Sequence, residues 1–503
     1  MTSGPSLTSS GTRVGPADDR RVFEEATAAL GSPNPERALP ALERALRTSR
    51  DYRLWHVHGL LLRQLERREE ALVSLKRAAE LNPEAPKTAF SLARTLYEAG
   101  LPSVEAYGQA LRLAPGDPEI VKGLAQAFIA DGDVDAAVSG LERIVARSPL
   151  WIDGHVFLSK LRWMEGERNG FTRSIDDALV QHPQSLDLRR EQIIALMHAE
   201  QWDEVLKRIE QGRAVIGKHP LFGANEAIVY AELGETERAD QLFAPYVEIE
   251  DGTVQVRRVR HMLRSGRPQQ AAELMDSWLY RPEGFMFWPY ASIAWRMVDK
   301  PRWEWLEGDD RLIGTYDIAD RLPPLDQLAD TLRRLHTLSG QPLEQSLRGG
   351  TQTDGDIFMH IDPVLVQLRE AIRTTVAEHI AKFPARDERH PLLAPPRGPI
   401  NFEGAWSVRL KAGGYHANHV HPAGWISSAL YIVLPPDIGQ NEAGVLTLGE
   451  PRAPSFQIDL PPVRTVEPKP GRLVLFPSYM WHGTRPFGEG ERITVAFDVA
   501  RLQ

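Results

Sequence analysis

The feature that most constrains this 503-residue chain is a repeat of about 34 residues in its first half. Prolines recur at steps of 32, 34, 34 and 37 residues, at Pro83, Pro115, Pro149, Pro183 and Pro220. Proline lacks an amide hydrogen and clashes with a preceding helical turn, so it marks the end of a helix. A period near 34 residues is typical of stacked helix–turn–helix units. The sequence therefore predicts a helical array.

Small and large side chains keep a common register inside these repeats. Between residues 52 and 85, the pattern is carried by Trp55, Gly59, Ala71, Leu75 and Ala78. We expect Gly59 and Ala71 to lie where two helices cross closely, with Leu75 filling the space beside them. The pattern resembles the tetratricopeptide repeat family. The resemblance implies about seven helix pairs over residues 17–300.

A helical array of this kind has two readings. It can offer a concave surface that binds a protein or peptide segment, which is the reading we favour. Alternatively, it serves as a spacer or as a dimerisation arm. The sequence does not fix the oligomeric state.

Composition excludes several classes of function. The formal net charge of −9 argues against a nucleic-acid partner, which requires a basic surface. The chain contains no cysteine, so any metal must be bound by His, Asp or Glu, and a reducing, cytoplasmic location is favoured. Residues 1–16 are rich in Ser, Gly and Thr without a signal-peptide core, and we expect a disordered tail there. We find no stretch long enough to span a membrane.

The chain changes texture after residue 300. We predict a connecting segment over 301–355 and a domain over 356–503 that opens with a helix at Pro363. From Ile400 onward, short apolar runs alternate with Gly and Pro clusters, which is typical of an antiparallel sandwich or jelly roll. The predicted fold class is therefore multidomain α+β, an all-α tetratricopeptide-type solenoid followed by a double-stranded β-helix.

Histidines gather on the predicted strands. His419 and His421 point to the same face of a strand, because side chains alternate sides. His482 follows about sixty residues later, and Arg492 and Thr494 stand ten and twelve residues beyond it. An arginine beside a hydroxyl can bind a carboxylate. His416 would point elsewhere on an unbroken strand, so we place it behind the ligands or facing the substrate.

This constellation resembles the 2-oxoglutarate/Fe(II) dioxygenases, in which a His-x-Asp or His-x-Glu pair and a distal His hold iron. The runs His419-Val-His-Pro, Arg348-Gly-Gly-Thr-Gln-Thr and Glu491-Arg-Ile-Thr are similar to bacterial oxygenases that follow tetratricopeptide repeats, over about 345–503. The resemblance implies Fe(II), 2-oxoglutarate and O2 as cofactors. The implied iron ligands and catalytic residues are His419, His421 and His482, and the implied co-substrate site comprises Arg492, Thr494 and Tyr431.

One departure from the family pattern leaves an alternative open. His421 occupies the position that usually holds a carboxylate, so either His421 or a carboxylate such as Glu403 is the third ligand. Arg409 is an alternative to Arg492 as the carboxylate-binding residue. Candidate walls of the active-site pocket are Trp406, Tyr415, Tyr431 and Trp481.

We therefore expect an Fe(II)/2-oxoglutarate-dependent dioxygenase that hydroxylates a protein or peptide recruited by the repeats. In such a reaction, 2-oxoglutarate is decarboxylated to succinate while a C–H bond of the substrate is oxidised. One alternative is a small-molecule oxygenase whose repeats dock a partner. Another is a non-catalytic, cupin-like binding scaffold.

Overall fold

The structure is a computed structural model that describes residues 16–436, 438, 440–452, 456 and 458–502. Residues 1–15 of the predicted disordered tail, 1–16, lie outside the described residues. The chain divides into two compact units, one formed by residues 1–131 with 359–362 and the other by residues 132–358 with 363–503. The predicted domain boundaries at 300 and 355 stay predictions.

The first unit is helical, as the repeat pattern predicts. Its elements are α1 (Pro16–Ala29), η1 (Pro35–Ala38), α2 (Leu39–Leu46), α3 (Tyr52–Gln64), α4 (Arg68–Leu81), α5 (Pro86–Glu98), α6 (Val104–Leu113) and α7 (Pro118–Ala130). A Cβ atom built on Gly59 would lie 2.6 Å from Cγ of Leu75, and Ala71 is fully buried. The predicted close crossing of α3 and α4 is therefore confirmed.

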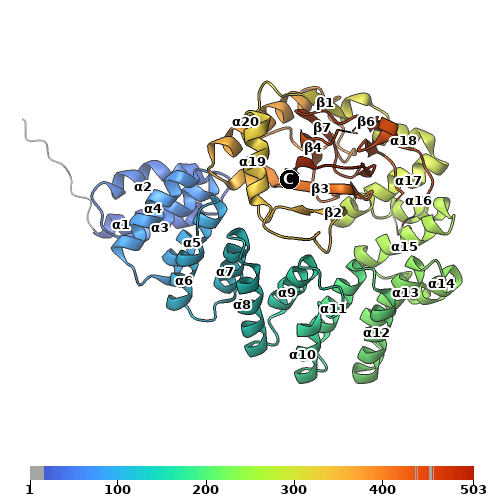
Figure 1. Cartoon of the computed structure of the whole chain (residues 1–503), viewed down its shortest axis with the longest axis horizontal. Helices are drawn as coiled ribbons and strands as arrows, with labels where there is room; N and C mark the ends of the chain where they lie inside the picture. Colours follow the sequence, from blue (N-terminus) through green and yellow to red (C-terminus); the bar gives the residue numbers. More distant parts are fainter. Residues whose placement is uncertain (1–15, 437, 439, 453–455, 457, 503) are drawn as a thin grey trace, which may run out of the picture. The chain divides into compact units, whose positions relative to one another are not determined.

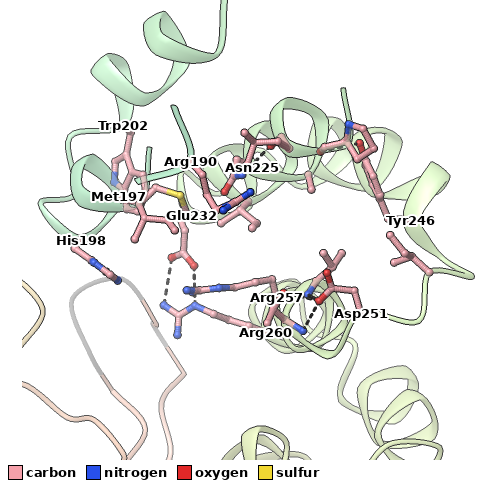
Figure 2. A pocket seen from close by; sticks show the side chains of 18 of the residues that line it. Arg190, Met197, His198, Trp202, Asn225, Glu232, Tyr246, Asp251, Arg257 and Arg260 are labelled. Atoms are coloured by element: carbon pink, nitrogen blue, oxygen red, sulfur yellow. Dashed lines mark hydrogen bonds and ion pairs between the residues drawn. The ribbon is translucent and has the colours of Figure 1, made fainter. Parts of the chain in front are cut away.

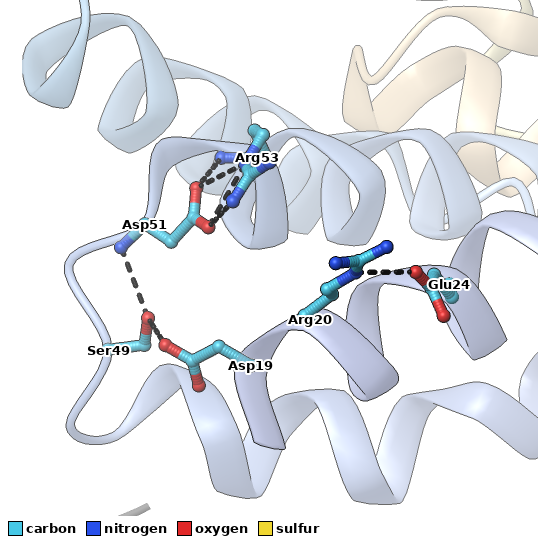
Figure 3. Close-up of polar contacts among 6 residues, drawn as sticks. All are labelled: Asp19, Arg20, Glu24, Ser49, Asp51 and Arg53. Carbon is cyan, nitrogen blue, oxygen red and sulfur yellow. Dashed lines mark hydrogen bonds and ion pairs between the residues drawn. The ribbon is translucent and has the colours of Figure 1, made fainter. Parts of the chain in front are cut away.

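The start of α3 shows how polar side chains fix a turn between helices (Figure 3). Asp51 caps the helix by accepting from the backbone N–H of Arg53 at 2.9 Å. The Ser49 hydroxyl accepts from the N–H of Asp51 at 3.1 Å and donates to Asp19 of α1 at 2.6 Å. These bonds satisfy donors at the helix start and connect it to α1.

The second unit begins with helices that follow one another along the chain (green in Figure 1). They are α8 (Val134–Arg147), α9 (Ile152–Met164), α10 (Arg173–Gln181), α11 (Leu186–His198), α12 (Trp202–Ile216), α13 (Pro220–Glu232), α14 (Thr236–Phe243), η2 (Ala244–Tyr246), α15 (Gly252–Arg264), α16 (Pro268–Asp276), η3 (Pro282–Met286), α17 (Trp288–Val298) and α18 (Lys300–Glu307). Later come η4 (Asp310–Leu312), α19 (Leu325–Leu335), η5 (Ile357–Met359) and η6 (Gln440–Glu442). The predicted helix at Pro363 is α20 (Pro363–Ile380).

Two antiparallel sheets follow. In the larger sheet the strand order is β1 (Gly314–Asp317), β7 (Arg472–Pro477), β4 (Ile426–Val433), β9 (Arg492–Val499), β3 (Phe402–His416) and β2 (Leu347–Gln352). The smaller sheet has the order β6 (Arg464–Val466), β5 (Leu446–Leu448) and β8 (His482–Thr484). The predicted fold class is confirmed as a helical-repeat region followed by antiparallel strands. The segment 301–355, predicted as a connection, contributes the outer strands β1 and β2.

The helices before the strands share their core. One apolar cluster runs from Val259 in α15 to Val499 in β9. The Tyr479 hydroxyl donates to the carbonyl of Leu306 at 2.9 Å, and the Arg296 guanidinium donates to the carbonyl of Gly449 at 2.9 Å. Helices α17 and α18 therefore support the sheets directly.

A second contact fixes the loop that enters β2. Leu343 is buried in a cluster with Trp163 of α9 and Ile193 of α11. Glu344 accepts from Lys160 of α9 at 3.1 Å and lies 3.6 Å from His198 at the end of α11. The helices thereby position the residues that precede β2, and these residues reach the histidine cluster.

Among the helices described here, none combines the length and the apolar character that crossing a bilayer requires.

Candidate metal centre

Backbone pairing brings the two distant histidine motifs together. His419 lies just beyond the end of β3 and His482 begins β8, and the two residues form an isolated antiparallel bridge. The N–H of His419 donates to the carbonyl of His482 at 2.9 Å, and the reverse bond is 3.0 Å. The N–H of His421 donates to the carbonyl of Ser478 at 2.9 Å. Three backbone bonds therefore fix the two segments that carry the three imidazoles.

Hydrogen bonds set which nitrogen of each ring is free. Nδ1 of His419 lies 2.8 Å from the carbonyl oxygen of Ala417, and Nδ1 of His482 lies 3.0 Å from that of Met480. Nδ1 of His421 lies 2.7 Å from Oδ2 of Asp498. Carbonyl and carboxylate oxygens only accept, so each Nδ1 carries the hydrogen and each neutral ring keeps its lone pair on Nε2.

The three rings converge on one point. One ligand nitrogen from each of His419, His421 and His482 lies within 4.8 Å of the other two. The ring centroids are 4.1 Å apart for His419 and His482, and 5.2 Å apart for His421 and His482. Ring nitrogens at this spacing suit a divalent cation such as Fe(II), Zn(II) or Mn(II), which binds imidazole nitrogen at about 2 Å. The ligand roles of the three histidines stay a prediction.

The pKa values of the three rings shift in different directions. It lowers the pKa of His482 well below its usual value, and neighbouring imidazoles add to the effect. Burial and the neighbouring histidines likewise hold the pKa of His419 well below its usual value. Burial also opposes the charge of His421, but the Asp498 carboxylate outweighs it and raises the pKa of His421. The rings of His419 and His482 therefore stay neutral and can offer a lone pair to a metal, whereas the ring of His421 is protonated more readily.

Asp498 is itself held in place. Its Oδ1 accepts from the Ser427 hydroxyl at 2.5 Å, and the hydroxyls of Ser427 and Ser478 lie 2.9 Å apart. Asp498 lies in β9, directly opposite Ser427 of β4 in the strand register. A carboxylate that orients the non-ligating nitrogen of a histidine is a common support in metal sites.

Ser346 and His416 complete the surroundings. The Ser346 hydroxyl lies 3.1 Å from Nδ1 of His416 and 3.1 Å from Nε2 of His419. Burial and the charge of Arg492 lower the pKa of His416 to about 3, so its ring stays neutral. His416 lies beside the three convergent histidines rather than among them, which agrees with the expected position.

Arg492 lies deeper, between the sheets. Its side chain is 2% exposed, and one terminal nitrogen donates to the carbonyl of Gly444 at 3.1 Å. Its Nε has no hydrogen-bond partner among the described residues, and neither has the buried Tyr431 hydroxyl. The Tyr431 ring centroid is 5.1 Å from the Arg492 guanidinium carbon. Within the described part of the chain no carboxylate pairs with Arg492, so this buried cation suits an anionic ligand.

Two cavities meet at the histidines. The inner one has a volume of about 50 Å³, is lined by residues of both sheets, and includes all three histidines with Arg492 and Thr494. Since one water needs about 10–15 Å³ of such volume, the inner cavity has room for roughly four waters, which suits a compact ligand. The outer cavity has a volume of about 540 Å³ and contains His419 and His421 in its lining. A ligand held by Arg492 in the inner cavity therefore lies next to the histidine nitrogens.

The other predicted residues divide into two groups. Trp406 lines both cavities, as expected of a wall. Trp481 instead donates to the carbonyl of Pro289 at 3.0 Å and packs on Tyr290 and Phe456, so its predicted role as a wall is wrong. Its apolar surface completes the core under α17. Tyr415 is half-buried and lines neither of these two cavities.

The two alternatives raised from the sequence find no support in the geometry. Glu403 is exposed and is not among the residues whose ligand atoms converge. Arg409 donates to Glu491 at 2.5 Å, so its charge is already matched. Sequence reasoning missed Asp498, Ser427 and Ser346. The only available signal was that Asp498 lies in the strand that also carries Arg492 and Thr494.

Fold and site together define a class: a helical-repeat protein whose C-terminal antiparallel sheets enclose three convergent imidazoles and a buried arginine. Comparison with family models agrees. Residues 404–498 match the model described as "Putative 2OG-Fe(II) oxygenase", and residues 52–84 and 104–160 match tetratricopeptide repeat models. The chain therefore carries tetratricopeptide repeats followed by a C-terminal domain of the 2OG-Fe(II) oxygenase family.

Solved structures with similar parts include both kinds of protein. MamA (41-end) from Desulfovibrio magneticus RS-1 is 15% identical, covers 35% of this chain and 99% of its own, and has a TM-score of 0.31. A tetratricopeptide repeat protein from Parabacteroides merdae is 16% identical, covers 49% of this chain and 99% of its own, and has a TM-score of 0.32. A Pseudomonas putida prolyl-4-hydroxylase is 17% identical, covers 38% of this chain and 94% of its own, and has a TM-score of 0.25. The comparison with curated proteins returns no match.

Proposed function

We propose that this protein is an Fe(II)- and 2-oxoglutarate-dependent dioxygenase that hydroxylates a protein or peptide recruited by its repeats. The observation that carries the proposal is the convergence of three Nε2 atoms beside a buried arginine that lacks a counter-charge. His419, His421 and His482 would hold the iron, and Arg492 would bind the distal carboxylate of 2-oxoglutarate, with Thr494 next to it. Bound iron with 2-oxoglutarate supplies the O2-dependent oxidation of a C–H bond.

The chain's own residues hold and shield this chemistry. The carbonyls of Ala417 and Met480 and the carboxylate of Asp498 fix the ring orientations, so the lone pairs point inward before any metal arrives. The inner cavity lies between the two sheets and has room for only a few waters, which a bound co-substrate would displace. The outer cavity leaves one side of the histidine cluster open to a substrate.

Two points support a macromolecular substrate. The repeats belong to a family that binds protein segments, and helices α9 and α11 contact the loop that enters the site. The outer cavity is lined by His198 at the end of α11 and by Glu200 just after it, as well as by residues of the sheets, so a substrate in this cavity contacts both. A small-molecule substrate is the alternative, with the repeats docking a partner.

The test is succinate formation by the full chain with Fe(II), 2-oxoglutarate and O2. We expect His482→Ala to lower Fe(II) affinity by more than about 100-fold in an anaerobic titration and to abolish succinate formation. We expect Arg492→Ala to keep Fe(II) affinity but to raise the 2-oxoglutarate concentration for half-maximal turnover by roughly 100-fold, since a buried carboxylate loses its charged partner.

Matched controls are His182→Ala and Arg147→Ala, which remove the same residue types far from the histidines in sequence and outside both cavities. Wild-type protein that binds Fe(II) yet forms no succinate would contradict the proposed activity. An Arg492→Ala variant with unchanged 2-oxoglutarate dependence would contradict the assigned carboxylate site.

A further inference from the structure

A third cavity lies within the repeat helices of the second unit. It has a volume of about 510 Å³ and is walled by α11, α13 and α15, the first helices of three successive pairs (Figure 2). On α11 its lining residues are Arg190, Ile194, Met197 and His198, which the spacings of four, three and one place on one helix face. Each of the three helices therefore presents one face to a shared space.

The wall of this cavity is largely apolar. Figure 2 shows Met197 and Trp202 at one side and Tyr246 at the other, with Arg190, Asn225 and Glu232 between them. Ile194, Leu221 and Ile228 add to the apolar lining. Such a surface suits an aliphatic or aromatic side chain.

The charges of the cavity are unevenly matched. Glu232 accepts from Arg260 at 2.7 Å and from Arg264 at 2.6 Å, so its charge is compensated. Asp251 caps α15 by accepting from the N–H of Thr253. Arg257 is exposed and has no ion-pair or hydrogen-bond partner among the described residues.

Arg190 reinforces this positive region. It faces the cavity and pairs with Asp187, in a contact where both side chains are about half exposed and which water screens. Besides Arg260, whose charge Glu232 compensates, two guanidiniums, one of them unpaired, thus face a space with an apolar wall. This combination suits a carboxylate that lies beside an apolar group.

The cavity continues to the metal centre through shared residues. His198 and Glu200, at the end of α11 and in the turn after it, line both this cavity and the outer cavity. The outer cavity in turn shares His419 and His421 with the inner one. Each of the two larger cavities is in the size range that holds one small ligand, so only an extended molecule engages both.

We infer that an extended polypeptide substrate lies across α11, α13 and α15 with an acidic side chain at Arg257, and that the adjoining outer cavity guides a neighbouring residue to the three histidines. This inference rests on the proposed function and specifies its substrate as an acidic, partly apolar peptide segment. Burial lowers the pKa of His198, and Arg257 lies close enough to that imidazole for its charge to lower the pKa further, so the acidic side chain would lie beside the junction of the two cavities.

The test uses the full chain and two fluorescein-labelled peptide pools of about 15 residues, roughly 50 Å when extended. In one pool a Glu stands a few residues from a Leu, and in the other Gln replaces Glu. Binding is measured by anisotropy with 2-oxoglutarate and Mn(II), in the absence of turnover. We expect the Glu pool to bind about 10-fold more tightly, as one charge-assisted contact allows.

Arg257→Glu should remove this preference for the Glu pool, whereas Arg147→Glu, the same charge reversal at an exposed residue that ends α8, should keep it. Equal binding of the two pools, no binding of either pool, or an unchanged preference in Arg257→Glu would overturn the inference. Succinate formation by wild-type protein and by Arg147→Glu is measured without peptide. If succinate forms while the peptide result is negative, only the inference fails; if no succinate forms, the proposed function fails.

Discussion

At the scale of single residues, the most informative contact is the one between Asp498 and His421. The family pattern has a carboxylate among the metal ligands, whereas in this chain three imidazoles converge and a carboxylate oxygen lies 2.7 Å from Nδ1 of one of them. The negative charge therefore lies behind an imidazole ring and not among the three convergent residues. Through His421, Asp498 makes that ring a stronger donor and fixes its orientation.

Replacing Asp498 with Asn tests this role. The amide oxygen can still accept from Nδ1 of His421, but the charge is lost. We expect metal affinity to fall by about 10- to 100-fold in a Co(II) or Fe(II) titration, with shifted Co(II) absorption bands. Ser427→Ala, which keeps the carboxylate, should change affinity less. Equal affinities of the Asp498→Asn variant and the wild type would show that the carboxylate does not support the ligand.

A second residue-scale prediction concerns His379, far from the metal centre in sequence. It is 1% exposed, its Nδ1 lies 3.1 Å from the Tyr316 hydroxyl, and burial lowers its pKa to about 4. Between pH 6.5 and about 4 the unfolded chain binds a proton at this residue that the folded chain does not, so stability falls as pH falls.

The pKa difference corresponds to a part of the free energy of unfolding on the order of 3 kcal/mol. This part is fully present above about pH 6.5 and is lost as the pH falls toward 4. Urea unfolding at several pH values measures it. His379→Gln should be less stable than the wild type at pH 7.5 but should lose less stability on acidification. Identical pH slopes for the two proteins would contradict the assignment.

The three convergent histidines were predictable from the sequence because the two-residue spacing and the distal motif are local patterns. The predicted strand was wrong at this point, since His419 and His421 lie beyond the end of β3, where only an isolated bridge forms. Asp498 was not predictable, because it is 77 residues from His421 and reaches it only through the register of β9 against β4. Register depends on pairing between distant strands and leaves no local signal. Ser346 was missed for a similar reason, since a docked loop carries it.

At the scale of elements, the crossing of α3 and α4 gives a stability prediction. The Cβ of an alanine at Gly59 would lie 2.6 Å from Leu75 Cγ and 3.2 Å from the Ala71 carbonyl oxygen. Gly59→Ala should therefore destabilise this unit by about 1–3 kcal/mol, because the packed helices must separate. Denaturant unfolding followed by circular dichroism measures the change.

Gly108 in α6 provides the matched control. A Cβ there would meet only one arginine nitrogen at 3.7 Å, an ordinary contact. Gly108→Ala should stabilise the helix by about 0.5–1 kcal/mol, since alanine has less backbone freedom to lose. Destabilisation of similar size in both variants would mean that the crossing at Gly59 is not unusually close.

Elements were predictable to the extent that they are long and periodic. The helix from Pro363 and the long strands β3, β4 and β9 follow clear apolar patterns. Strands β1, β6 and β8 have only three or four residues, too few for a period to show. β2 is a glycine-rich segment whose partner strand is β3, and its pairing depends on the docked loop before it.

At the scale of the whole molecule, the sheets depend on helices that precede them. The shared core includes α15, α17 and α18, and β1 pairs with β7 along the edge of the larger sheet. A fragment of residues 345–503 lacks the three helices and β1. We expect it to aggregate or to unfold without a cooperative transition, because it exposes the apolar face that these helices cover.

Residues 132–503, which keep the second unit together, should unfold cooperatively by calorimetry and should retain Fe(II) affinity. A cooperative transition of residues 345–503 alone would contradict this view of the core. The sequence marks residue 300 as the end of the repeats, but a change of texture along the chain does not reveal which helices share a core with later strands.

The residues His198 and Glu200 have a consequence beyond binding. They belong to the repeats, yet they form part of the rim through which the histidines are reached. A recombination that exchanged these repeats for another array would also remove part of that rim. The repeats are therefore not an independent module of this chain, and any exchange of them must keep the end of α11 and the turn after it.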